Sequence, residues 1–513
     1  GKLANELVVN GRPVETQIYV NLNDSVLIGN CPINLRKLAF QYGLESEVFT
    51  FNPKNETCTI GNYEGCDVVF NDGISKHWQI KVFRNQNAVG ASEYTLDPTG
   101  CPHRVGYNGR TLKKLEPVAA ECHIFIAKQV FHCSFLGGVV RSEPFRFRDF
   151  IARSVRFCFQ DNTLALDDIS FEIDYGDLVA VMGPSGCGKS TLLNIINGYN
   201  KPNDGNIEIN AYDLHHDYQA LKDYLGYVPQ DDLLFENLTV YENLFYNAKL
   251  RHPDISDEEI TALVEQTIID IDLVEKRDIR AGSPTQRTLS GGQRKRVNIG
   301  LELLADADVY FLDEPTSGLS SKDSEKIIEL LQRLTLKGKI VFVVIHQPSS
   351  KIYKMFSKIL FLDKGGKTAF FGDNMAALAY FKTHSLEAHV TSSPVNPETA
   401  AEMVECPVCK NVEPDLLLET LEEPLRDIDG VPLSQRKYAP MYWKEKFLDY
   451  RSSVHRLTIE DSERVSLPPP RALSPTEKWA QFTSLLKRNF TNKFRDRSNL
   501  IITFLEAPVL ALA

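Results

Sequence analysis

Short apolar runs separated by turn-forming residues characterise the first 140 residues of the chain. Residues 17–20, 68–70 and 78–82 are such runs. Turn signals lie between the runs, at Asn10-Gly11, Asn71-Asp72-Gly73 and Asn108-Gly109. Many short strands with frequent turns are typical of an all-β sandwich, which we predict for residues 1–140.

The pattern changes at about residue 151, where strands begin to alternate with helices up to residue 384. Asp177–Met182 reads as a strand, and a helix is expected from Thr191 to Gly198. Val309–Leu312 and Ile340–Ile345 are unbroken apolar runs. Such runs are expected for parallel strands buried on both faces, so residues 151–384 are predicted to form an α/β domain.

Polar sequence follows over residues 385–473, which we predict to be a linker or small insert. Ser474–Phe494 then carries apolar residues at spacings of three and four, which predicts an amphipathic helix within residues 474–499. Leu500–Ala513 is almost wholly apolar and follows a basic stretch. A basic flank before an apolar run indicates the cytosolic start of a membrane helix, here truncated; a buried terminal helix is the alternative.

Composition narrows the class of protein. The 513 residues are 43% hydrophobic and 24% charged, as in globular proteins, and their number suggests about three domains. The formal net charge of -11 argues against nucleic acid as a partner. The 10 cysteines are mostly single, which favours free thiols in a reducing cytosolic compartment. The chain opens like a cut fragment, without a secretory signal.

Residues 183–190 fit the pattern G-x-x-x-x-G-K-[ST] of a phosphate-binding loop. Its glycines let backbone N–H groups point at phosphate oxygens, Lys189 reaches the β- and γ-phosphates, and Ser190 offers a hydroxyl to Mg²⁺. The loop follows a predicted strand and precedes a predicted helix, which is the required context; a plain glycine turn is the alternative. The predicted ATP-binding residues here are Gly183, Pro184, Ser185, Gly186, Cys187, Gly188, Lys189, Ser190 and Thr191.

Two adjacent carboxylates end the apolar strand at residues 309–312. Asp313 can hold Mg²⁺ together with Ser190 and Gln230, and Glu314 can deprotonate an attacking water. The Gln230 amide can coordinate the Mg²⁺ ion or the attacking water, and His346 can hydrogen-bond the γ-phosphate. Taken alone, Gln230 is a weak signal that also fits an ordinary loop glutamine, and His346 fits better a strand-end histidine with a satisfied partner.

A glycine turn at residues 289–293 (Leu-Ser-Gly-Gly-Gln) precedes a helical run. Ser290 can donate to a phosphate, and a helix N-terminus favours an anion. Ser290 also suits a helix N-cap, but a cap alone does not explain the double glycine. The predicted phosphate contacts are Ser290, Gly291, Gly292 and Gln293.

Together these stretches resemble the nucleotide-binding domain of ATP-binding cassette (ABC) proteins over residues 151–384. The resemblance implies that two cassettes form a dimer, here expected to be a homodimer, with each ATP held between the phosphate loop of one chain and the Leu-Ser-Gly-Gly-Gln turn of the other. It makes Glu314 the general base and Ser290 a contact to the partner's ATP. It also suggests an aromatic residue on adenine, for which we favour Phe159 over Phe157; packing in the core is the alternative.

Within that family, residues 289–304, 313–319, 345–348 and 362–372 resemble G-type half-transporters. In those proteins a connecting helix and six membrane helices follow the cassette, and most export. The resemblance therefore implies the cytoplasmic part of an exporter at a cell (inner) membrane. The chain departs from the family at Ser320, where aspartate is common, and this puts the coupling between the two ATP sites in doubt.

Residues 58–115, within a domain expected at about 58–137, resemble a forkhead-associated (FHA) domain, which binds phosphothreonine peptides. The matching stretches are residues 60–61, 66–70, 74–77 and 107–109. The family's arginine is replaced by Asn62, the Ser75–His77 spacing is one residue short, and the usual serine-asparagine-glycine turn is absent. Since the arginine supplies the bidentate phosphate contact, we expect a phosphate-independent module that is regulatory or binds a protein partner.

Cys406 and Cys409 form half of a zinc ribbon. Four ligands are usual for structural zinc, so the alternatives are zinc shared with another chain and plain thiols. Two other classes of protein stay open: a soluble ABC ATPase and an FHA-type signalling scaffold. About six apolar segments beyond Ala513 would favour the transporter over the soluble ATPase.

Overall fold

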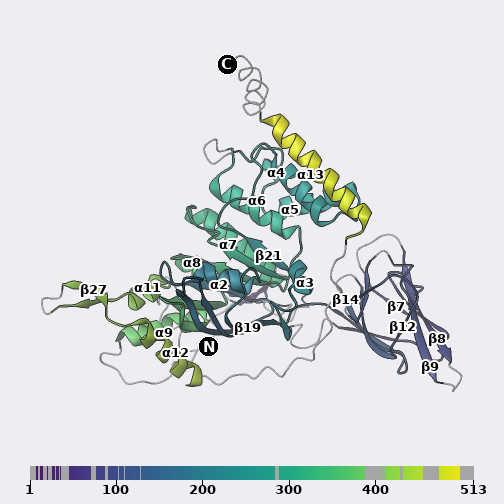
Figure 1. The fold of residues 1–513 in the computed structure, drawn as a ribbon, viewed down its shortest axis with the longest axis horizontal. Coiled ribbons are helices and arrows are strands. Elements are labelled where there is room, and N and C mark those ends of the chain that lie inside the picture. Colours follow the sequence, from purple (N-terminus) through teal and green to yellow (C-terminus); the bar gives the residue numbers. More distant parts are fainter. Residues whose placement is uncertain are drawn as a thin grey trace, which may run out of the picture. The chain divides into compact units, whose positions relative to one another are not determined.

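The structure, a computed structural model, describes two compact units (Figure 1). The described residues are 46–70, 77–86, 91–126 except 102 and 109, 129–282, 288–386, 406, 411–427, 431–453 and 473–496, with short pieces between 7 and 38. The first unit consists mainly of residues 1–148 and the second of residues 149–458 and 472 onward, and each is described by itself.

The first unit contains a small sheet and two larger ones. The small sheet has the order β2-β1-β3-β4. The larger sheets have the orders β11-β10-β13-β14-β15-β5 and β12-β9-β8-β6-β7. The strands are β1 (Leu7–Val9), β2 (Arg12–Pro13), β3 (Val26–Ile28), β4 (Cys31–Ile33), β5 (Glu47–Thr50), β6 (Thr57–Gly61), β7 (Val68–Val69), β8 (Gln79–Gln86), β9 (Ser92–Asp97), β10 (Val105–Tyr107), β11 (Arg110–Leu112), β12 (Glu116–Val118), β13 (Glu121–Ile126), β14 (Gln129–Ser134) and β15 (Val139–Pro144).

The two larger sheets share one hydrophobic core, as a sandwich requires. Ile80 and Leu96 come from one sheet and Ile124 and Phe131 from the other, and all four are fully buried in the same cluster. Alternation of buried and exposed positions along β8 fits one face on this core. The many short strands expected here are therefore found. Residues 17–19 of the strand expected at 17–20 lie outside the described residues, as do the turns at 10–11 and 71–73 and Gly109.

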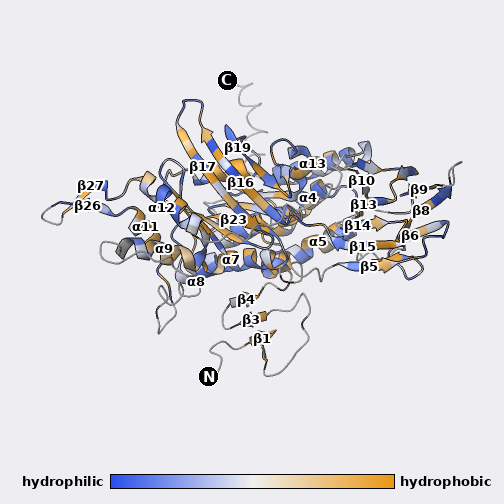
Figure 2. Cartoon of the chain, turned by 90° about the horizontal axis from the view of Figure 1, so that it is seen from below, coloured by the Kyte–Doolittle hydropathy of each residue, from blue (hydrophilic) through white to orange (hydrophobic). Residues whose placement is uncertain are grey.

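The second unit is built on a six-stranded sheet of order β21-β22-β23-β18-β24-β25, parallel except for β25. A second sheet, β17-β16-β19-β20, is antiparallel, and hydrophobic and hydrophilic residues alternate along β16 and β17 (Figure 2). The strands are β16 (Asp149–Cys158), β17 (Leu164–Asp174), β18 (Leu178–Met182), β19 (Asp204–Ile209), β20 (Tyr212–Asp213), β21 (Leu225–Val228), β22 (Val309–Asp313), β23 (Ile340–Val344), β24 (Lys358–Asp363) and β25 (Lys367–Asp373).

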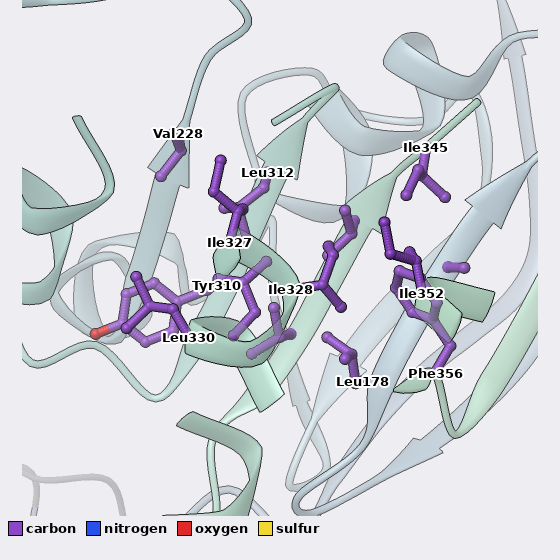
Figure 3. Close-up of a cluster of buried hydrophobic side chains, with 14 of the residues drawn as sticks. Leu178, Val228, Tyr310, Leu312, Ile327, Ile328, Leu330, Ile345, Ile352 and Phe356 are labelled. Atoms are coloured by element: carbon purple, nitrogen blue, oxygen red, sulfur yellow. The ribbon is translucent and has the colours of Figure 1, made fainter. Parts of the chain in front are cut away.

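Helices of this unit pack on the parallel sheet. Ile327 and Ile328 of α7 contact the same core as Leu178 of β18 and Leu312 of β22 (Figure 3). The helices are α2 (Lys189–Ile196), α3 (Tyr218–Leu221), α4 (Val240–Arg251), α5 (Asp257–Asp270), α6 (Gly291–Leu303), α7 (Ser321–Leu336), α8 (Ser350–Met355), α9 (Asn374–Leu386), α11 (Asp415–Leu421), α12 (Pro440–Ser453) and α13 (Pro475–Arg495), with 3-10 turns η1 (Lys222–Tyr224) and η2 (Val274–Lys276).

Capping boxes explain where several of these helices begin. In each box a serine or threonine accepts the N–H of the residue three positions on, whose side chain accepts the N–H of the cap in return. The pairs are Thr239–Glu242 for α4, Ser256–Glu259 for α5, Ser290–Gln293 for α6 and Ser474–Glu477 for α13.

Residues 411–453 belong to the segment expected to be a linker or small insert, and they are folded. It forms α11, a hairpin of β26 (Pro424–Arg426) and β27 (Pro432–Arg436), and α12. Trp443 and Phe447 of α12 are buried in the core of the parallel-sheet unit. Lys444 Nζ donates to the Asp167 carbonyl at 3.2 Å, and Arg436 Nη1 donates to the buried Asp363 at 2.8 Å. These anchoring residues cannot be recognised from the composition of the segment. The segment is an integral part of the unit.

Replacement of Trp443 tests this integration. Because the side chain is fully buried, Trp443→Ala is expected to lower the free energy of unfolding of the second unit by about 3–5 kcal/mol. Met441→Ala, at a half-exposed position of the same helix, is the matched control and is expected to have little effect. Denaturant unfolding of both variants measures the difference, and equal midpoints would show that α12 is not part of the core.

Candidate nucleotide site

The loop at residues 183–188 connects β18 to α2 at the carboxyl edge of the parallel sheet, where ligands bind in such folds. Its backbone requires glycine at particular positions. Gly183 has φ of +143°, and a Cβ there would lie 2.2 Å from the Leu362 carbonyl oxygen. Gly188 has φ of +101°, and a Cβ would lie 2.7 Å from the Ala165 carbonyl oxygen. Close approach by β24 and β17 therefore holds the loop in one conformation.

Lys189 is the first residue of α2, and its ammonium folds back over this loop. Nζ donates to the carbonyl oxygens of Gly183 at 2.9 Å and Pro184 at 2.8 Å. The side chain is only 6% exposed, so a positive charge is fixed within the loop. Fixed charge beside oriented N–H groups at a helix N-terminus is suited to phosphate.

Ser190 and Asp313 come together across 123 positions of sequence, with Ser190 Oγ 3.3 Å from Asp313 Oδ1. Burial raises the pKa of Asp313, and the neighbouring charge of Glu314 adds to the effect. A hydroxyl and a carboxylate are hard oxygen ligands that fit Mg²⁺, which commonly takes one or two carboxylates and completes its shell with substrate phosphates and water. In the described part of the chain no group of three or more His, Cys, Asp or Glu forms a metal cage by itself.

Glu314 lies at the centre of the residues predicted to be catalytic. His346 Nε2 is 2.7 Å from Glu314 Oε1, and Gln230 Nε2 donates to Glu314 Oε2 at 3.2 Å. Glu314 has φ of +45°, a conformation that costs energy for a residue with a side chain and that is common at functional sites. The structure thus brings together three residues that lie 84 and 32 positions apart in sequence.

The turn at residues 289–293, called the signature turn below, begins α6. Ser290 is the N-cap and accepts the N–H of Gln293 at 3.2 Å, which leaves its hydroxyl hydrogen for another acceptor. Among the described residues no hydrogen bond or ion pair joins this turn to the phosphate loop. The turn therefore presents a donor and a helix N-terminus that its own chain's loop does not use.

Three basic side chains that follow the signature turn were not assigned a role from sequence, and all three are buried. Lys295 Nζ donates to the carbonyls of Pro229 and Gln230 at 2.9 and 2.8 Å, and so fixes the backbone that carries Gln230. Arg294 and Arg296 bind other backbone carbonyls, those of Ala281 and Ile271. Composition alone would place such residues on the surface, and only the fold reveals that they attach α6 to its neighbours.

Phe159 follows β16, and its side chain is 46% exposed. Its ring packs edge to face against the ring of Phe157, with 5.3 Å between the ring centroids. This exposure argues against the alternative of packing in the core. The neighbouring strand β17 contacts the phosphate loop through Ala165, so the hairpin that carries Phe159 adjoins the loop.

Other predicted features fall partly or wholly outside the described residues. Cys409 and Leu500–Ala513 are not described, nor is Ser75. Cys406 is described and half-buried. Of the helices that the structure describes, none combines the length and the apolar character that crossing a bilayer requires.

Comparisons with known proteins show what the chain is similar to. Residues 166–317 match the family described as ABC transporter. The chain is 32% identical over 342 residues to ABC transporter G family member 14 of Arabidopsis thaliana, covering 66% of this chain and 50% of that protein. It is 40% identical over 232 residues to an ABC-type transporter of Penicillium crustosum, covering 45% and 31%, and 38% identical over 221 residues to an ABC transporter ATP-binding/permease protein of Mycobacterium tuberculosis, covering 43% and 25%.

The chain therefore contains an ABC-type ATPase domain, which binds and hydrolyses ATP. Its relatives include members of the G family of ABC transporters, and the chain spans about half or less of the length of these three relatives. A solved dimeric structure of the ATP-binding cassette MJ0796 with ADP and Pi is 29% identical and covers 44% of this chain and 98% of that one, with a TM-score of 0.39.

Proposed function

We propose that this chain is the ATP-hydrolysing, cytoplasmic part of a G-type-like ABC transporter, most similar in role to an exporter, at a cell (inner) membrane. Two cassettes form a dimer, and ATP hydrolysis between them drives transport through membrane helices downstream. The observation that carries the proposal is the grouping around Glu314, whose two carboxylate oxygens are held by Gln230 and His346.

Each residue of this grouping has a chemical task. Glu314 accepts a proton from the attacking water, while Gln230 and His346 hold the carboxylate in one orientation. Lys189 and the loop N–H groups bind the β- and γ-phosphates, and Phe159 stacks on adenine. Ser190 and Asp313, with Gln230 as the third predicted ligand, would hold Mg²⁺, which supplies charge neutralisation for the phosphates when bound.

The position of the signature turn supports dimerisation. Ser290 to Gln293 offer a phosphate site that the chain's own loop does not use, so a second copy of the chain is the natural source of the phosphate. The test is sedimentation of the full chain carrying Glu314→Gln, with and without MgATP. A shift from monomer to dimer on adding MgATP is expected; a monomer at all concentrations would contradict the dimer.

The outer face of α13 supports attachment to a membrane surface. Trp479, Phe482, Leu486 and Phe490 are each more than half exposed. The opposite side is fastened to the cassette, because Gln481 Nε2 donates to the Leu250 carbonyl at 2.7 Å and Arg495 pairs with Glu242 at 2.7 Å (Figure 1). An amphipathic helix with aromatic residues on its free face is suited to a bilayer surface.

Tryptophan fluorescence can test this attachment. Trp78 and Trp443 are buried, whereas Trp479 is 67% exposed, so a change in emission on adding vesicles reports mainly on α13. We expect a blue shift with phospholipid vesicles that Trp479→Phe removes. Unchanged emission would favour a soluble ABC ATPase.

For the β-sandwich we propose a phosphate-independent module that binds a protein partner. At the position of the FHA arginine, Asn62 Oδ1 accepts the N–H of Trp78 at 3.0 Å, so this side chain serves the fold. Titration with phosphothreonine peptides is expected to give no phosphate-dependent binding. Micromolar binding that requires the phosphate would instead support an FHA-type signalling role.

A further inference from the structure

The segment that follows Glu314 carries an acidic residue that the proposed chemistry does not use. Residues 315–320, called the exit loop here, lead from the catalytic carboxylate into α7. Ser320 is the N-cap of α7 and accepts the N–H of Asp323 at 3.2 Å. The Ser320 hydroxyl in turn donates to Asp323 Oδ2 at 2.9 Å. The Asp323 carboxylate is thus bound to the end of the exit loop.

Asp323 also packs directly on the signature turn of the same chain. A Cβ placed on Gly292 would lie 2.5 Å from Asp323 Cγ and 2.6 Å from its Cβ. A Cβ on Gly291 would lie 3.0 Å from a methyl carbon of Leu319 in the exit loop. Neither glycine has a positive φ, so close packing, and not backbone conformation, accounts for the double glycine.

These contacts join two regions that act at different ATP molecules. The exit loop begins at Glu314, which serves the chain's own ATP, whereas the signature turn faces the partner's ATP in the proposed dimer. Asp323 lines the same hollow as Gln230, Glu314, Gly291 and Gly292. A shift of the signature turn would therefore be passed through Asp323 to the exit loop.

We propose that Asp323 is a positioning residue that holds the signature turn in register with the exit loop and so links the two ATP sites. The Asp323 carboxylate lies in the first turn of α7. It accepts a hydrogen bond from the Ser320 hydroxyl on one side and contacts Gly292 on the other. This inference rests on the proposed cassette dimer.

The test uses the full chain and steady-state ATP hydrolysis over a range of ATP concentrations, with the thermal midpoint of each variant. Asp323→Ala is expected to lower kcat roughly tenfold and to bring the Hill coefficient to about 1, with a smaller change in KM. Lys322→Ala, at an exposed position one residue earlier, is the matched control and is expected to behave like the wild type.

A second variant separates a positioning role from loss of packing. Asp323→Ala combined with Ser320→Asp returns a carboxylate to the site, because position 320 lies within a hydrogen bond of the Asp323 oxygen, and aspartate also caps helices well. Recovery of kcat and of cooperativity is expected. Normal cooperativity in Asp323→Ala, or no recovery in the double variant, would overturn the proposal, whereas a wild-type chain that stays monomeric with MgATP would overturn the dimer itself.

Discussion

Glu314→Gln is expected to lower ATP turnover by roughly two to four orders of magnitude while ATP binding is preserved. The amide has the shape of the carboxylate and its oxygen still accepts from Gln230 or His346, but it cannot take a proton from water. Since neither the phosphate loop nor the Ser190–Asp313 pair is changed, the affinity for MgATP should stay within about threefold of the wild type.

Phosphate release and equilibrium binding of a fluorescent ATP analogue measure the two quantities separately. Glu329→Gln is the matched control, since this carboxylate lies on α7 and is exposed. It accepts a long hydrogen bond from Lys351 Nζ, at 3.4 Å. Turnover in Glu314→Gln close to that of the control would mean that another group is the base.

Lys189→Ala is expected to weaken ATP binding itself, by roughly 10- to 100-fold. The substitution removes a buried positive charge and leaves the Gly183 and Pro184 carbonyls without their donor. The same binding assay checks this, with Lys201→Ala as a control at an exposed lysine. An unchanged dissociation constant would contradict the assignment of Lys189 to the phosphates.

The phosphate loop and the parallel strands could be predicted from sequence because their signals are local. A buried strand, a glycine loop and a helix follow one another within about twenty residues, and the strand Leu178–Met182 lies within one residue of its expected bounds. The same holds for Val309–Asp313 and for Ile340–Val344. Periodicity also predicted α13. The side of this helix that faces the cassette is nevertheless polar, with Ser484 buried there.

Features that depend on contacts between distant segments could not be predicted. Lys295 reads as a surface residue until α6 is placed against the loop that carries Gln230, 65 positions away. The segment 411–453 contains prolines and is only weakly periodic, yet Lys444 reaches Asp167 across 277 positions. Ser320 signalled a departure from related proteins, but its pairing with Asp323 required the geometry of the helix start.

The central claim is that the phosphate loop and the signature turn of one chain belong to different ATP sites. Mixing two impaired variants tests it most directly: Lys189→Ala, which damages the loop, and Ser290→Glu, which places a negative charge in the signature turn. In a mixed dimer one site receives the intact loop of one chain and the intact turn of the other. Random pairing restores about a quarter of the wild-type sites, so the account predicts ATP turnover well above that of either variant alone. A mixture no more active than the mean of the two variants would contradict it.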